Sequence, residues 1–266
     1  MTLWQGILLG LVQGLTEFLP VSSSGHLRVL EVATGVRTPG VFVEVTLHVA
    51  TLAAVLVVYG RRLVELLGGA IRGRPAELRM VGLLAIATVP AGVVGVLFHH
   101  KVEEAATPLV FIGAAFIVTG FMNWSTRGRG GGGGGGTKPD PGVAGAAGIG
   151  AAQAVAAVVR GISRSGSTVC AGLWSGLDPV AAAEFSFLLA IPVIGGAAML
   201  EGRHAAVSIA AVGAVPLAVS FVIAFAAGLW SIRFLVALLK RGRFFEFAPY
   251  NWAIGVLTII YGLWHG

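Results

Sequence analysis

The chain has 266 residues, a formal net charge of +6, 56% hydrophobic residues and only 11% charged residues. Soluble domains usually carry about 25% charged residues, so this composition and a mean hydropathy of +0.88 exclude an ordinary soluble protein. The basic residues are confined to short connections between apolar runs, which favours membrane topology over nucleic-acid binding. The single cysteine, Cys170, excludes an intramolecular disulfide and a cysteine metal cluster.

The first segment, Met1–Leu19, resembles a signal peptide only superficially. It lacks a basic start, Glu17 interrupts its far end, and no clean cleavage site follows. We therefore expect it to remain in the mature protein.

Long apolar runs follow, and each approaches the roughly 20 residues that a helix needs to cross a bilayer. They do not alternate apolar and polar residues as barrel strands do, so they predict helices. The six runs are Val41–Gly60, Val81–Phe98, Leu109–Trp124, Phe185–Leu200, Val207–Gly228 and Trp252–Trp264.

Three connections are rich in lysine and arginine: Arg61–Arg79, Arg127–Lys138 and Arg233–Arg243. The positive-inside rule places them in the cytoplasm. The N-terminal segment and the C-terminus then fall on the outer side.

A glycine tract, Gly130–Gly136, predicts a flexible cytoplasmic linker over residues 127–141 between two halves, 1–126 and 142–266. The halves resemble each other: Gly10–Gln13 echoes Gly150–Gln153, and a serine cluster follows each. Three long runs follow each cluster, and an odd number places the halves in opposite orientations. Such inverted repeats are typical of transporters with sites near the midplane.

Each serine cluster ends a run that is too short or too interrupted to span the membrane comfortably. Non-helical backbone at membrane depth requires surrounding protein or a wet cavity. The sequence therefore predicts re-entrant helical hairpins over about 1–38 and 142–180, with their polar tips meeting inside the membrane. The expected fold is an all-α polytopic membrane protein with six transmembrane helices and these two hairpins, arranged as an inverted-topology repeat.

The first polar motif, Gln13–His26, places a carboxylate, hydroxyls and an imidazole between apolar stretches. Ionisable groups at this depth are costly, which indicates a functional site. The alternative is a polar cluster that packs helices together, but Glu17 together with His26 is hard to explain by packing.

The second motif, Gly161–Thr168, contains Arg164 between serines and glycines. An arginine fork suits phosphate oxygens, small neighbours let backbone amides approach the same anion, and a helix N-terminus adds positive charge. The alternative is a surface loop whose arginine only sets topology.

Together the motifs resemble the undecaprenyl-diphosphate phosphatase family, also called bacitracin-resistance proteins. Its first pattern, Glu/Gln-Gly-x-Thr-Glu leading into Pro-Val-Ser-Ser-x-Gly-His, is matched from Gln13 to His26. Its second, Pro-Gly-x-Ser-Arg-Ser-Gly, is matched from Gly161 to Gly166. Further likeness lies in Glu44–Val55 and Ala183–Pro192, so the resemblance spans nearly the whole chain.

The chain departs from the family pattern at three positions. Arg160 stands where the family usually has proline, which adds a charge at the entrance of the anion loop. Gln13 stands where many members have glutamate, so one carboxylate that could bind a metal is lost. Ala50 replaces a common glycine.

The resemblance implies hydrolysis of undecaprenyl (polyprenyl) diphosphate to the monophosphate and inorganic phosphate, which recycles a lipid carrier for cell-wall or glycan synthesis and gives bacitracin resistance. It also implies a multi-pass protein of the cell membrane, an active site open to the outer face, and help from a divalent cation, Mg²⁺ or Ca²⁺. Membrane lipids are the expected surroundings, and a homodimer is as open as a monomer because glycine-rich helices pack both within and between chains.

The residues leave several nucleophiles open: Ser23, Ser22, His26 or an activated water. We favour attack by Ser23 with His26 and Glu17 assisting, and Arg164 neutralising phosphate. Glu17 and Gln13 are the candidate metal ligands. The expected substrate-binding residues are Ser22, Ser24, Gly25, Ser163, Ser165, Gly166 and Thr168.

Glu44 and His48 either line the cavity or form a helix-end pair, and Glu184 and Ser186 have the same two interpretations in the second half. The inverted halves also suggest a different function, a transporter or flippase of polyprenyl phosphate, alone or beside the phosphatase activity. An ion channel explains Glu17, His26 and Arg164 poorly.

Overall fold

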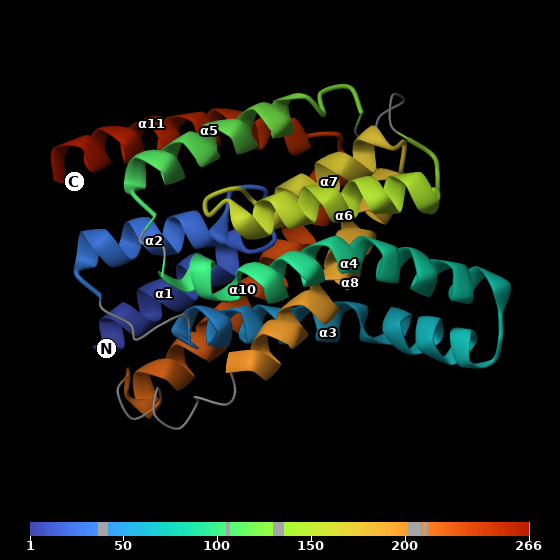
Figure 1. Ribbon diagram of the computed structural model, residues 1–266, viewed down its shortest axis with the longest axis horizontal. Helices are drawn as coiled ribbons and strands as arrows, with labels where there is room; N and C mark the ends of the chain where they lie inside the picture. Colours follow the sequence, from blue (N-terminus) through green and yellow to red (C-terminus); the bar gives the residue numbers. More distant parts are fainter. Residues whose placement is uncertain (37–41, 105–106, 130–135, 202–208, 210–211, 266) are drawn as a thin grey trace.

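A computed structural model describes the chain except for residues 37–41, 105–106, 130–135, 202–208, 210–211 and 266. The described part is helical, apart from one isolated bridge between Lys138 and Leu177 (Figure 1). Residues 130–135 of the predicted linker, which make up most of its glycine tract, lie outside the described residues. The helices are α1 (Leu3–Thr16), α2 (Ser23–Thr34), α3 (Phe42–Ile71), α4 (Pro75–Glu104), α5 (Leu109–Trp124), α6 (Gly142–Val158), α7 (Arg164–Trp174), α8 (Pro179–Glu201), α10 (Ala214–Lys240), the 3₁₀ turn η2 (Phe244–Glu246) and α11 (Phe247–His265).

Four helices within the described residues are long and apolar enough to cross a membrane, judged by length and composition: α3, α4 over Pro75–Gly95, α8 over Pro179–Leu200, and α10. They contain four of the six predicted runs, in whole or in part. The other two runs lie in α5, which has only 16 residues, and in α11. The chain is therefore a helical protein of the kind that crosses membranes several times.

The serine clusters begin helices, and their hydroxyls are the caps. Ser22 precedes α2 and its hydroxyl accepts the amide of Gly25, at 3.3 Å. Ser163 precedes α7 and its hydroxyl accepts the amide of Gly166, at 3.0 Å. Caps of this kind satisfy amides that have no partner within the helix. Each predicted polar motif therefore contains the N-terminus of a short helix.

Helices of the two halves pack across one another rather than side by side as separate units (Figure 1). Helix α1 packs against α10, α6 against α4, and α5 against α11. The closest approaches use glycine: a Cβ at Gly10 would collide with the carbonyl oxygen of Ser220, and one at Gly150 would lie 2.7 Å from that of Ala87. Small residues permit such contacts between membrane helices. These two glycines occupy the repeated positions that the sequence predicts.

The tip between α1 and α2 is anchored in the protein interior. Phe18 is fully buried and packs edge-on against Phe187 of α8, with ring centroids 5.3 Å apart. Cys170 is buried in the same cluster and is a free thiol. The neighbour of Phe18, Glu17, is held at this depth by the packing of that ring.

Candidate active site

A cavity of about 310 Å³ lies where the two polar motifs meet. The start of α2 and the start of α7 both contribute to its wall, and α3 and α6 supply further polar groups. An apolar side is formed mainly by α8 and the end of α6. The lining residues are Glu17, Ser22, Ser23, Ser24, Glu44, Val45, His48, Gln153, Ala156, Ala157, Arg160, Ile162, Ser163, Arg164, Val193, Ile194 and Ala197.

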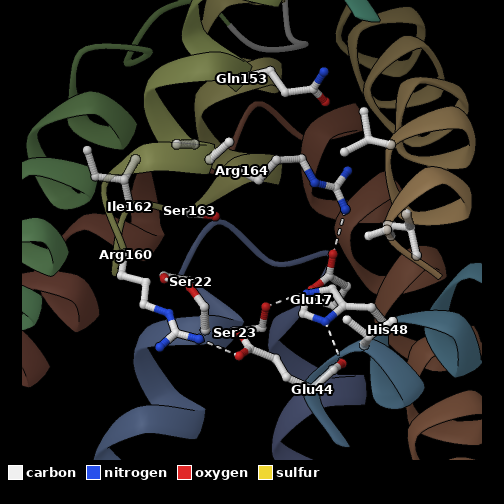
Figure 2. A pocket seen from close by; sticks show the side chains of 17 residues that line it. Glu17, Ser22, Ser23, Glu44, His48, Gln153, Arg160, Ile162, Ser163 and Arg164 are labelled. Carbon is white, nitrogen blue, oxygen red and sulfur yellow. Dashed lines mark hydrogen bonds and ion pairs between the residues drawn. The ribbon is translucent and has the colours of Figure 1, made fainter. Parts of the chain in front are cut away.

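Glu17 is the centre of the hydrogen bonds in this cavity (Figure 2). Its Oε2 accepts from the hydroxyl of Ser23 at 2.6 Å and from the amide nitrogen of Gln13 at 3.0 Å. The Nε2 of His48 lies 3.3 Å from the same oxygen. On the other side, Arg164 Nη2 donates to Oε1 at 2.5 Å. Four segments of the chain thus converge on one carboxylate.

His48 contacts acceptors with both ring nitrogens. Its Nδ1 lies 2.7 Å from the backbone carbonyl of Glu44, which can only accept, and its Nε2 faces the Glu17 carboxylate. Both nitrogens therefore donate, which is the imidazolium form of the ring. The positive charges of His48 and Arg164 offset the buried negative charge of Glu17, whose side chain is only 4% exposed.

Arg164 keeps one donor free. Its Nη2 binds Glu17, while its Nη1 is buried and has no hydrogen-bond partner among the described residues. A buried guanidinium nitrogen without an acceptor is costly, and an anion in the adjoining cavity would satisfy it. The N-termini of α2 and α7 at the same cavity add partial positive charge.

Two asparagines fix the tip that carries Glu17. Asn123 of α5 and Asn251 of α11 both donate to the carbonyl oxygen of Pro20, at 2.8 and 2.9 Å. The non-helical tip thereby has its backbone satisfied by buried amides, as membrane depth requires. Sequence reasoning missed both residues, although an amide within or beside an apolar run is itself a signal.

The hydrogen bonds of His26 join it to Ser22 and Tyr250 rather than to Ser23, the residue that the sequence pairs with it. Its Nδ1 donates to the backbone carbonyl of Ser22 at 2.7 Å, and its Nε2 forms a hydrogen bond with the Tyr250 hydroxyl at 2.7 Å. The ring stacks on Tyr250, 5.7 Å between centroids. The hydrogen-bond partner of Ser23 is Glu17 instead. His26 holds Ser22, whose φ of 67° is the positive value of a strained non-glycine residue.

The remaining predicted binding residues divide into two groups. Ser22, Ser24 and Ser163 line the cavity. The others are not among the lining residues. The backbone amides of Gly25 and Gly166 donate to the capping hydroxyls of Ser22 and Ser163. Ser165 donates to the carbonyl oxygen of Leu19 at 3.2 Å, and Thr168 forms a hydrogen bond with Ser186 at 2.6 Å. For these four the arrangement indicates support of the cavity rather than contact with its contents.

Glu44 and Glu184, to which the sequence gives two interpretations each, lie at different cavities. Glu44 lines the cavity and pairs with Arg160, 2.6 Å between Oε2 and Nη2. Glu184 lies at a different cavity, where it pairs with Arg62 at 2.8 Å. The two halves therefore contribute unequally to the site.

Glu17 and Gln13 do not fit a divalent cation held between them. Three donors surround Oε2, the Arg164 guanidinium faces Oε1, and Gln13 turns its amide nitrogen toward the carboxylate. The Oε1 of Gln13 is the one acceptor left without a partner there. Within the described residues, no group of three or more His, Cys, Asp or Glu side chains could hold a metal ion. A cation at Oε2 would have to displace these donors, and one at Oε1 would lie beside the positive charge of Arg164.

Comparisons with known proteins agree on one family. Residues 6–257 match the family model described as bacitracin resistance protein BacA. A protein of Desulfosudis oleivorans named undecaprenyl-diphosphatase is 40% identical over 97% of this chain and 98% of its own length. Proteins of the same name from Desulforapulum autotrophicum and Treponema denticola are 37% and 38% identical, each over 98% of this chain and 99% and 98% of their own lengths.

Proposed function

We propose, from the premise that this chain belongs to the bacitracin resistance protein BacA family, that it is a membrane phosphatase. Its reaction is the hydrolysis of undecaprenyl diphosphate, or another polyprenyl diphosphate, to the monophosphate and inorganic phosphate. The product is the carrier lipid that cell-wall or glycan synthesis reuses. Bacitracin resistance follows from the same activity.

One observation carries the proposal: a serine hydroxyl, a carboxylate and a partly unpaired arginine meet in one cavity. Ser23 donates to Glu17 at 2.6 Å, and Arg164 joins the other carboxylate oxygen while keeping Nη1 free. Phosphoryl transfer through a covalent phosphoserine needs a nucleophile, a base that takes its proton and a group that donates hydrogen bonds to the phosphate. These three side chains can supply them.

In the proposed reaction, Ser23 Oγ attacks the terminal phosphorus while its proton passes to Glu17. The bond from that phosphorus to the bridging oxygen breaks, and the prenyl monophosphate leaves as an anion. Water then attacks the phosphoserine, the phosphorus–Oγ bond breaks, and the proton on Glu17 returns to Ser23. Inorganic phosphate is released.

Arg164 and the N-termini of α2 and α7 neutralise the terminal phosphate during both steps. His26 acts as a positioning residue, because its bond to Ser22 holds the strained turn that presents Ser23. His26 or water as the attacking group are the alternatives to Ser23 that the test below separates.

We also propose that the two halves form an inverted repeat with re-entrant hairpins, α1–α2 and α6–α7, between six membrane crossings. The pattern of packing supports this: α1 contacts α10 as α6 contacts α4, and α10 and α4 hold equivalent places in the two halves. We further propose that the cavity opens toward the outer face of the cell membrane; the basic connections, which the positive-inside rule assigns to the cytoplasm, support this.

The family resemblance includes a divalent cation. Because Glu17 and Gln13 do not fit one, we propose that Mg²⁺ or Ca²⁺ arrives with the diphosphate oxygens of the substrate, which are its natural ligands. Titrating a chelator against the rate of hydrolysis measures the requirement.

Phosphate release by purified protein in detergent tests the function. Wild-type protein, Ser23→Ala, His26→Asn and Arg164→Gln receive a polyprenyl diphosphate with Mg²⁺ or Ca²⁺. We expect release by the wild type, a loss of at least about 10³-fold for Ser23→Ala, and partial activity for His26→Asn.

If the wild type releases no phosphate, the phosphatase function is wrong. The transporter function that the inverted halves suggest would then remain. Full activity of Ser23→Ala with none for His26→Asn would move the nucleophile to His26. Full activity of both variants would indicate that an activated water is the nucleophile.

A further inference from the structure

The cavity contains a second arginine that the proposed reaction does not use. Arg160 and Arg164 line the same cavity from the segment before α7 and from its first residue (Figure 2). They approach the serine cluster from different sides: Arg164 reaches Glu17, and Arg160 reaches Glu44. Two cationic groups therefore flank one potential anion site.

The two arginines lie at different depths. The Arg164–Glu17 pair has side-chain exposures of 17% and 4%, while the Arg160–Glu44 pair has exposures of 23% and 21%. The first pair lies at the reacting serine, and the second, more exposed pair lines the same cavity. A ligand with two phosphoryl groups in a row would place one at each.

The backbone path at residue 160 does not require an arginine there. Val159 before it is extended, with φ −93° and ψ 93°, and so avoids the helical region that a following proline disfavours. The sharp reversal follows at Gly161, with φ 99°, where a Cβ would lie 2.9 Å from that of Ala115. The turn is therefore built by its neighbours, and the guanidinium is an addition to it.

We propose that Arg160 binds the phosphate that stays on the lipid, while Arg164 binds the phosphate that is removed. In the free protein Arg160 forms an ion pair with Glu44. When the substrate binds, its phosphate competes with Glu44 for the guanidinium of Arg160. Arg160 thereby makes this site select a diphosphate over a monophosphate. The inference rests on the proposed function and names the group that reads the second phosphate.

A simpler role would be that Arg160 only neutralises Glu44. The two roles differ when both residues are changed. If Arg160 only neutralises Glu44, then removing both charges, in Arg160→Gln with Glu44→Gln, restores wild-type behaviour. If Arg160 binds phosphate, the double variant stays defective.

The test measures kcat and KM for a polyprenyl diphosphate. The proteins are wild type, Arg160→Gln, Arg160→Pro, Glu44→Gln and the double variant. The matched control is Arg62→Gln, which breaks a similar arginine–glutamate pair between α3 and α8 outside this cavity. A second readout is protection of each protein against thermal unfolding by inorganic diphosphate and by inorganic phosphate.

We expect Arg160→Gln and Arg160→Pro to raise KM for the diphosphate by roughly 10- to 100-fold, since one charge-assisted contact is lost. The kcat changes less, because the phosphate that is removed keeps its contact with Arg164. Protection by inorganic diphosphate falls while protection by inorganic phosphate persists. Arg62→Gln behaves as the wild type.

A wild-type KM for Arg160→Gln, or recovery in the double variant, would overturn the inference. If the wild type releases no phosphate, the proposed function fails by itself. The protection readout then still decides whether Arg160 binds the second phosphate.

Discussion

Glu17 is a buried carboxylate that survives burial because four donors from four segments surround it. Gln13 of α1, Ser23 of α2, His48 of α3 and Arg164 of α7 each contribute one. An unpaired charge at this depth would cost several kcal/mol. The partners also fix the direction of each oxygen, so that Oε2 faces the hydroxyl that the proposed reaction deprotonates.

His48 offers a test of this arrangement. His48→Leu removes a donor to Glu17, and we expect kcat/KM to fall by about 10- to 100-fold. His48→Gln keeps a donor of similar reach, and we expect a loss below about 5-fold. Steady-state kinetics of both variants check this, and equal losses would show that the donated hydrogen bond is not what matters.

At the scale of elements, the short helices reach the cavity because glycine lets them approach their partners closely. Gly10 of α1 faces the backbone of α10, and Gly150 of α6 faces that of α4. Each of these helices is followed by a tip that carries site residues. A shift of either helix would move Glu17 or Arg164 away from the other.

The glycine contacts predict a difference between two alanine substitutions. Gly10→Ala inserts a methyl group against the Ser220 carbonyl, and we expect a loss of about 1–3 kcal/mol in stability with lower activity. Gly82→Ala of α4 meets nothing within 4 Å, and alanine favours a helix by about 0.5–1 kcal/mol. Thermal unfolding in detergent compares them; equal midpoints would contradict the packing argument.

At the scale of the whole molecule, the two hairpins bring their tips together through contacts that cross between halves. Ser165 after the second tip bonds Leu19 of the first, and Asn251 near the C-terminus bonds Pro20. Neither half could build the cavity alone. The proposed inverted repeat would explain why two helix N-termini face one cavity.

Membrane sidedness tests that arrangement, and the buried Cys170 leaves the native chain a suitable background. Leu3→Cys and Thr34→Cys, at the two ends of the first hairpin, should both react with an impermeant thiol reagent from outside the cell. Thr137→Cys, within the predicted linker, should react only after permeabilisation. Reaction of Leu3→Cys and Thr34→Cys from opposite sides would exclude a re-entrant hairpin.

The helical, membrane-crossing character of the chain and its family could be predicted from the sequence, because the apolar runs and the Gln13–His26 motif are local features. It could not show that His48 rather than His26 joins Glu17, or that Arg160 meets Glu44. Those pairings depend on how helices distant in sequence pack. The bounds of α5 were predictable, because its apolar run Leu109–Trp124 coincides with the helix. The start of α11 was not, because the helix begins at Phe247, before the apolar run that starts at Trp252.

The stereochemical course at the transferred phosphorus tests the central claim most directly, because it needs no variant. The substrate is a polyprenyl diphosphate whose terminal group is a chiral, isotope-labelled thiophosphate, hydrolysed in labelled water. Attack by Ser23 followed by water inverts the phosphorus twice, so the account predicts net retention in the released thiophosphate. Net inversion would mean that water attacks directly, and would contradict Ser23 as the nucleophile.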